Sequence, residues 1–251
     1  MNTDKELTGK VAIITGAARN LGRGFAEALA RRGADIVGHY NSERSRVDAE
    51  ETARLVRASG SRAALVAGDL TDPATPRRLF DEATEAFGRV DILINNAGMI
   101  IKKPIGEITE QDFDTIYAVN AKAPFLCMQQ AARRLSDGGR IVNLGTSILG
   151  MSVPFYGIYA GSKASLEHMS RDLAVQLRGR GITVNTIAPG ALDTPFFHAA
   201  ETPESIAFVK HITGGLGAVQ DVVPLVEFLV SPASRWLTGQ TIFVNGGLLT
   251  R

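Results

Sequence analysis

The chain has 251 residues, 45% of them hydrophobic, which is enough for one large α/β domain with a sizeable core. Its 27 Lys and Arg residues balance 26 Asp and Glu residues, so its net charge of +1 gives no reason to expect nucleic acid or a membrane surface as a partner. The only cysteine, Cys127, allows no internal disulfide, and no signal peptide or membrane-spanning apolar run is evident, so we expect a buried, inert thiol and a cytoplasmic location.

Strand-like and helix-like segments alternate along the chain. Short apolar runs predict buried strands at 11–15, 34–40, 63–67, 92–94, 140–144, 182–187 and 240–244. Amphipathic segments predict helices at about 21–32, 45–59, 76–87, 109–135, 159–177 and 219–229. This alternation predicts an α/β Rossmann fold, a doubly wound parallel sheet with helices on both faces. Since no linker or repeat divides the chain, residues 1–251 are expected to form a single domain.

Residues 191–217 interrupt the alternation. They show poor periodicity and carry two histidines and three glycines. Long loops in compact domains are uncommon and often functional, so we predict a substrate lid here. The histidines are expected to be solvated, because neither has a partner at metal-ligand spacing, and we predict no metal site. The pair Lys102-Lys103 is expected to form a solvated turn, with steering of an acidic substrate as the alternative.

A glycine-rich turn follows the first predicted strand. Gly16 and Gly22 lie where a strand gives way to a helix, with Arg19, Asn20 and Leu21 between them. Glycines in such a turn let backbone N–H groups approach a pyrophosphate at a helix N-terminus. The alternative is a simple tight turn, but the strand–helix–strand context favours a dinucleotide.

The end of the second predicted strand bears on the choice of dinucleotide. An acidic residue there would bind the ribose 2′-hydroxyl and repel a 2′-phosphate. This chain has Tyr40, Asn41 and Ser42 instead, and Arg19 supplies a positive charge nearby. We therefore predict NADP(H), with NAD(H) as the alternative. Asn41 and Ser42 could also do no more than begin the next helix, and Arg19 could be solvated.

Tyr159 and Lys163 are four residues apart, so on a helix both side chains project from one face. A phenol has an unperturbed pKa of roughly 10, and a nearby positive charge favours the phenolate. Such a pair can exchange a proton with a substrate oxygen near neutral pH. Tyr156 has no lysine four residues later, so we expect it to line the substrate pocket or to pack.

Taken in order, several motifs resemble the short-chain dehydrogenase/reductase family over nearly the whole chain. They are Thr15-Gly16-x3-Asn20-x-Gly22, Asp69-Leu70, Asn95-Asn96-Ala97-Gly98, Asn120, Ser147, Tyr159-x3-Lys163, and Pro189-Gly190 with Thr194. The turn is similar to that of pteridine reductases, and the rest is similar to β-ketoacyl carrier-protein reductases and to sugar or ketone reductases. Asn20 departs from the family glycine, but asparagine tolerates positive φ better than most residues.

The resemblance implies a role for each matching residue. Tyr159 would be the general acid or base, and Lys163 would hold the nicotinamide ribose and lower the pKa of Tyr159. Ser147 would polarise the substrate oxygen, with Thr146 as the alternative hydroxyl, and Asn120 would hold a water molecule. The residues implied in cofactor binding are Gly16, Arg19, Asn20, Leu21, Gly22, Tyr40, Asn41, Ser42, Asp69, Leu70, Asn96, Ala97, Gly98, Tyr159, Lys163, Pro189, Gly190, Leu192 and Thr194.

These observations favour an NADP(H)-dependent oxidoreductase that moves a hydride between nicotinamide and a small carbonyl or secondary alcohol. Within the family, a β-ketoacyl thioester reductase, a sugar or polyol dehydrogenase and a pterin reductase stay open. A nucleotide-binding module without catalysis is the alternative from another class. The resemblance also implies a homotetramer or homodimer, formed through the long helices and the last strand.

Overall fold

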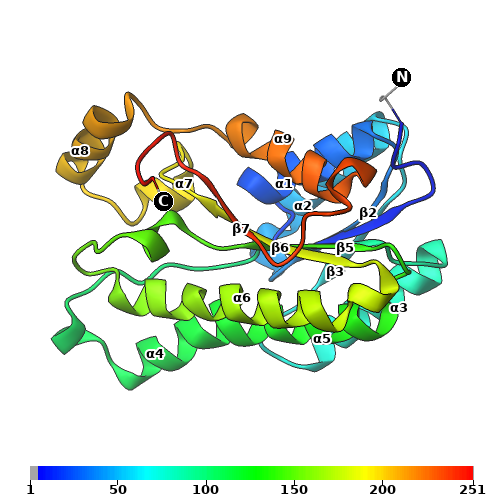
Figure 1. Cartoon of the computed structure of the whole chain (residues 1–251), viewed down its shortest axis with the longest axis horizontal. Helices are drawn as coiled ribbons and strands as arrows, with labels where there is room; N and C mark the ends of the chain where they lie inside the picture. The colour runs from blue at the N-terminus through cyan, green and yellow to red at the C-terminus, as the bar shows by residue number, and fades with distance from the viewer. Residues whose placement is uncertain (1–4, 251) are drawn as a thin grey trace.

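Seven parallel strands form one sheet in the order β3-β2-β1-β4-β5-β6-β7 (Figure 1). The computed structural model describes residues 5–250, so residues 1–4 and 251 of the predicted domain lie outside the described part. The strands are β1 (Val11–Ile14), β2 (Asp35–Tyr40), β3 (Ala63–Ala67), β4 (Ile92–Asn95), β5 (Arg140–Leu144), β6 (Thr183–Pro189) and β7 (Thr241–Val244). The predicted doubly wound parallel sheet is confirmed.

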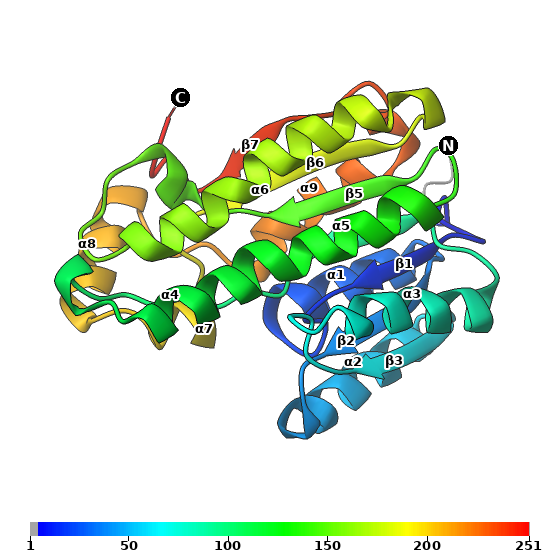
Figure 2. The same ribbon diagram turned by 90° about the horizontal axis from the view of Figure 1, so that it is seen from below.

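Helices cover both faces of this sheet (Figures 1 and 2). They are α1 (Asn20–Arg31), α2 (Arg46–Ala58), α3 (Ala74–Phe87), α4 (Glu110–Tyr117), α5 (Ala123–Arg134), α6 (Gly157–Gln176), α7 (Pro195–His198), α8 (Pro203–Thr213) and α9 (Val219–Val230). Strand order reverses between β1 and β4, which opens a crevice at the carboxyl ends of these two strands.

The apolar side chains form two main clusters, one on each face of the sheet. Phe25 of α1 and Val226 of α9 pack in the first cluster, where both are almost fully buried. Phe80 of α3 and Leu166 of α6 pack in the second, together with Cys127 of α5. Burial raises the pKa of the Cys127 thiol to about 12, as expected for an inert cysteine. The two clusters hold the sheet rigid beneath its carboxyl edge.

Two predictions of local structure were wrong. The long helix expected at 109–135 is broken into α4 and α5 by a π-helical turn, Ala118–Lys122. Single π-helical turns inside α-helices occur often at functional sites. The segment expected to be a long loop, 191–217, contains α7 and α8. Within residues 5–250, no helix is long and apolar enough to cross a membrane.

Candidate active site

A cavity of about 630 Å³ opens at the carboxyl edge of the sheet. Most residues predicted from the sequence line it: Gly16, Arg19, Asn20, Leu21, Tyr40, Asn41, Asp69, Leu70, Asn96, Ala97, Gly98, Ser147, Tyr159, Lys163, Pro189, Gly190, Leu192 and Thr194. Gly22, Ser42 and Asn120 are absent from the lining. Ser45 and His39, which were not predicted, line the cavity near Tyr40.

The glycine-rich turn is packed too tightly to accept side chains at key points. A Cβ atom at Gly22 would lie 2.1 Å from the carbonyl oxygen of Gly16, so Gly22 supports the turn from behind instead of lining the cavity. Gly16 has a φ of +64° and Asn20 a φ of +52°, both in the left-handed region. Asparagine at position 20 thus takes a backbone conformation that glycine also takes easily.

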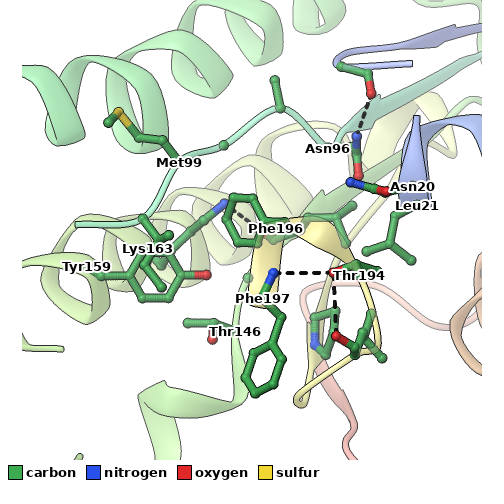
Figure 3. Close-up of a pocket in the computed structure, with 18 of the residues that line it drawn as sticks. Asn20, Leu21, Asn96, Met99, Thr146, Tyr159, Lys163, Thr194, Phe196 and Phe197 are labelled. Carbon is green, nitrogen blue, oxygen red and sulfur yellow. Dashed lines mark hydrogen bonds between the residues drawn. The ribbon is translucent and has the colours of Figure 1, made fainter. Parts of the chain in front are cut away.

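Hydrogen bonds from Asn96 fix this turn to the end of β4. Its side-chain amide donates to the carbonyl oxygens of Thr15 (3.0 Å) and Gly16 (3.1 Å). The hydroxyl of Thr15 accepts in return from the backbone N–H groups of Asn96 (2.9 Å) and Ala97 (3.0 Å). Figure 3 shows Asn96 beside Asn20 and Leu21 at this end of the cavity. Asn96 therefore stabilises the conformation of the glycine-rich turn.

His39, at the end of β2, makes a second bridge to the turn. Its Nδ1 accepts a hydrogen bond from the Gly16 N–H (3.3 Å), and its Nε2 lies 2.8 Å from the carbonyl oxygen of Gly68. Because a carbonyl can only accept, Nε2 carries the proton. Burial lowers the pKa of His39 to about 4, so the ring is neutral at pH 7. The sequence signal was a histidine at a strand end, which by itself does not indicate this bridge.

Arg19 brings a positive charge to the end of the cavity that Tyr40 and Asn41 line. Arg19 is 3.8 Å from the carboxylate of Asp48, with 63% of its side chain exposed. Arg23 also approaches Asp48, at 3.7 Å. Both arginines therefore approach one exposed carboxylate on α2, and the Arg19 guanidinium lines the cavity together with Tyr40 and Asn41. The sequence analysis had not identified Asp48 as a partner.

Tyr159 and Lys163 lie on one face of α6, as their spacing predicts, and both are buried. The Lys163 ammonium donates to the carbonyl oxygen of Leu144 (2.8 Å) at the end of β5. Burial lowers the pKa of Lys163 to about 8. A Cβ atom at Gly98 would lie 3.1 Å from the Lys163 Nζ and 3.2 Å from the Asn120 Oδ1, so glycine at this position leaves room for both groups.

The pKa of Tyr159 differs from the expectation that Lys163 lowers it. Burial raises this pKa above its ordinary value, and a hydrogen bond from the Thr146 hydroxyl opposes the rise. Figure 3 shows Thr146 close to the ring of Tyr159. The phenol is therefore protonated at neutral pH, the form that can donate a proton.

Thr146 and Ser147 use their hydroxyl groups differently. The Ser147 hydroxyl donates to the carbonyl oxygen of Ala188 (2.8 Å), and only 1% of the residue is exposed. The Thr146 oxygen accepts weakly from the Ile148 N–H (3.4 Å), which leaves its proton for the Tyr159 oxygen. The sequence motif favours Ser147, whereas the hydroxyl that bonds to the phenol is that of Thr146.

Asn120 lies behind the cavity, in the π-helical turn. Its Oδ1 accepts from the Met99 N–H (2.9 Å), and its Nδ2 donates to the Met99 carbonyl oxygen (2.8 Å) and to the Ser162 hydroxyl (3.0 Å). The side chain thus joins the loop after β4 to α6 instead of bonding to the backbone of its own helix.

The other end of the cavity has mostly apolar walls. Met99 and Ile100 come from the loop after β4, Val153 from the segment before α6, and Phe196 and Phe208 from α7 and α8. Glu201 and Ser205, from the same segment as the phenylalanines, also line this end. In the described part of the chain, no group of three or more His, Cys, Asp or Glu residues is placed to hold a metal ion.

Known proteins resemble this chain in sequence and fold. A family model described as enoyl-(acyl carrier protein) reductase matches residues 16–249. A "short-chain type dehydrogenase/reductase" of Picea abies is 41% identical, covering 96% of this chain and 93% of the relative. The chain belongs to the short-chain dehydrogenase/reductase family. As a member, it is an NAD(P)-dependent oxidoreductase that acts on carbonyl or alcohol groups.

Two further members give more detail. A "hydroxynaphthalene reductase-like protein Arp2" of Metarhizium brunneum is 39% identical and covers 99% of this chain and 98% of the relative. The crystal structure of a putative dehydrogenase of Burkholderia cenocepacia with bound NADP is 44% identical, with a TM-score of 0.95 over 100% of this chain and 97% of that chain. The fold is therefore that of the family.

Proposed function

We propose that this protein reduces a neutral, apolar ketone or aldehyde with NADPH, or oxidises the corresponding alcohol with NADP⁺. The observation that carries the proposal is the position of Tyr159. Its phenol lies in the cavity wall with Thr146, between the glycine-rich turn and the apolar end. A carbonyl at this point would meet a proton donor on one side and the nucleotide end of the cavity on the other.

Tyr159 and the residues around it would each have a separate role in the reaction. Tyr159 would give its proton to the substrate oxygen during reduction, since burial keeps the phenol protonated. Thr146, with Ser147 beside it, would polarise that oxygen. Lys163 would hold the nicotinamide ribose, and Asn120 would hold the water that returns protons through Lys163. The cofactor, when bound, supplies the hydride, and the protein orients it.

Three features support NADP(H) over NAD(H). The end of β2 has no carboxylate, Arg19 stands at the cavity edge, and its exposed partner Asp48 is shared with Arg23. A 2′-phosphate would meet the guanidinium of Arg19. The Burkholderia relative, 44% identical, contains bound NADP.

The walls of the substrate end support an apolar substrate. Met99, Ile100, Val153 and the lid phenylalanines offer few partners for the hydroxyl groups of a sugar, which would lose its hydration on entry. A flat aromatic or alicyclic ketone would instead bury its surface there. The printed name of the Metarhizium relative, a hydroxynaphthalene reductase-like protein, fits this class. β-Ketoacyl thioesters and pterins remain the alternatives to test.

The remaining predictions become part of the proposal. We propose that residues 1–251 act as one domain, that 191–217 is the substrate lid, and that the protein works as a cytoplasmic homotetramer or homodimer. The partly exposed apolar residues of β7 support an oligomer, because they lie on the last strand of the sheet.

The first experiment measures NADPH oxidation with a panel of apolar ketones, sugars, β-ketoacyl thioesters and pterins. The Tyr159→Phe variant should lose turnover by roughly a hundredfold or more while keeping its NADPH affinity. Tyr117→Phe, which removes a hydroxyl outside the cavity lining, is the matched control. Unchanged turnover in Tyr159→Phe would overturn the proposal, and a clear preference for sugars would overturn its substrate class.

A further inference from the structure

A buried carboxylate joins the lid to the body of the protein. Glu201 lies between α7 and α8, and its side chain is only 2% exposed. One of its oxygens accepts from the Lys102 ammonium (2.6 Å) and from the Ser205 hydroxyl, and the other accepts from the Tyr156 hydroxyl. Lys102 was expected in a solvated turn, but 19% of its side chain is exposed and its charge is paired.

The lid has few other buried anchors. Neither α7 nor α8 contains a buried residue, and Phe208 is 66% exposed. The base of the lid is closed by backbone hydrogen bonds from Asp193 N–H to the Gly217 oxygen (2.7 Å) and from Gly217 N–H to the Ala191 oxygen (3.0 Å). Residues 193–216 therefore leave and re-enter the fold at one point, with Glu201 as their buried polar contact to the body.

The contact between Glu201 and Tyr156 also connects the lid to Tyr159. Tyr156 packs edge-on against Tyr159, with ring centroids 6.0 Å apart, and the Lys102 ammonium lies 5.0 Å from the centroid of the Tyr156 ring. Phe155, just before Tyr156, has a φ of +71°, an unfavourable conformation for a bulky residue, and its carbonyl oxygen accepts from the Lys103 N–H (3.2 Å). Strained backbone of this kind persists where surrounding contacts hold it and is common at functional sites.

We propose that Glu201 is a latch that closes the lid, and that its contacts with Lys102 and Tyr156 position Tyr159 for catalysis. In the closed state the Glu201 carboxylate and the Lys102 ammonium lose their hydration, and they bind each other while the carboxylate also accepts from two hydroxyl groups. When the lid opens, both charged groups are hydrated again. This hydration offsets part of the free energy needed to separate them, so the lid can open for ligand exchange. Glu201 is a positioning residue and takes no part in proton transfer. This inference rests on the proposed function of the same cavity.

The test compares Glu201→Gln and Lys102→Met with wild-type enzyme. Stopped-flow fluorescence measures the rate of NADPH release, which should rise about tenfold in each variant, corresponding to ~1.4 kcal/mol less stabilisation of the closed lid. Hydrogen exchange of the α8 amides, measured without cofactor, should also accelerate. Because both changes break one contact, the double variant should be no worse than either single variant.

Two controls separate the latch from general surface effects. Glu204→Gln changes an exposed acid on the same segment, and Lys103→Met breaks an exposed pair with Asp112. Both should keep wild-type release rates. The swapped pair Lys102→Glu with Glu201→Lys should recover part of the slow release. If the Glu201 or Lys102 variants unfold, Ser205→Ala and Tyr156→Phe remove single hydroxyl groups and should accelerate release by a smaller factor.

The outcomes distinguish the latch from the proposed function. Faster release and faster exchange support the latch even if no carbonyl in the panel is reduced, a result that would count against the proposed function alone. Unchanged release and exchange in folded Glu201→Gln and Lys102→Met would overturn the latch, even with normal carbonyl reduction. Loss of kcat with unchanged release and unchanged exchange would also overturn the latch, because it would show that the contact with Tyr156 positions Tyr159 without holding the lid closed.

Discussion

The two ends of the cavity are built in different ways. At the nucleotide end, backbone groups in close contact define the shape, and the side chains that support them, His39 and Asn96, bond to backbone atoms of the turn. At the substrate end, α7 and α8 bury no residue of their own and are held by the base of the lid and by Glu201.

This difference indicates which changes each end can accept. In a turn where backbone packs against backbone, no flexible side chain can move aside. Even one added methyl group must therefore displace the main chain. A helical segment held by a few side chains can change its sequence as long as those contacts persist. The nucleotide end therefore presents one fixed shape, whereas the substrate end can vary to suit its ligand.

The largest effect is expected from adding a methyl group in the rigid turn. In Gly22→Ala, the new Cβ would lie 2.1 Å from the Gly16 oxygen and 2.9 Å from the Ala17 Cα. Because both contacts are with backbone, we expect the NADPH dissociation constant to rise at least about a hundredfold and the free energy of unfolding to fall by about 3 kcal/mol. Fluorescence titration and thermal unfolding measure the two quantities.

Gly179→Ala is the control for this change, because a Cβ there meets nothing within 4 Å. It should bind NADPH like the wild type. A near-normal NADPH affinity in Gly22→Ala would show that the turn can rearrange to accept a methyl group. The two ends of the cavity would then not differ in rigidity.

The sequence predicted the nucleotide end better than the substrate end, for the same physical reason. Strand–helix alternation predicted the parallel sheet, and glycines in a turn mark close backbone approach whatever side chains surround them. His39 was missed because its role depends on Gly68, a residue brought near by the pairing of β2 with β3. Such a contact leaves no local pattern.

The substrate end depends on contacts between segments far apart in the chain. Lys102 and Glu201 are separated by 99 residues, and nothing near either residue predicts their pairing. Helix α8 does have local signals, Thr202 as a cap and Gly214 at its end, but its weak burial removes the apolar periodicity that predicts helices. The break at Ala118–Lys122 did have a local signal, Pro124 at the start of α5, because proline lacks the N–H group that an uninterrupted helix needs there.

Thr146 and Ser147 lie where the two ends meet, and their variants give the next largest effect. We expect Thr146→Val to lower kcat about a hundredfold, because it removes the hydroxyl bonded to Tyr159. Ser147→Ala should cost less, since its hydroxyl donates to the Ala188 carbonyl oxygen. Steady-state kinetics at saturating NADPH compare the variants. A larger loss of kcat in Ser147→Ala than in Thr146→Val would show that Ser147 supplies the polarising hydroxyl, as the motif predicts.

The last prediction concerns stability at low pH, away from the conditions of activity, and again involves the rigid end. The pKa of His39 is about 4 in the folded protein, against 6.5 for an ordinary histidine, because burial disfavours the charged ring. Between these values the unfolded chain binds more protons than the folded chain. The stability linked to His39 is therefore fully present above pH 6.5 and is lost as the pH falls toward 4, by about 3 kcal/mol in the free energy of unfolding.

His39→Gln tests this dependence, because glutamine offers an acceptor and a donor but does not titrate. The variant should be less stable than the wild type at pH 7, and the difference should shrink as the pH falls to 4. Denaturant unfolding at several pH values measures it, with the exposed His168→Gln as the control. A constant difference would mean that the pKa of His39 is the same in the folded and unfolded chains, and that burial does not lower it.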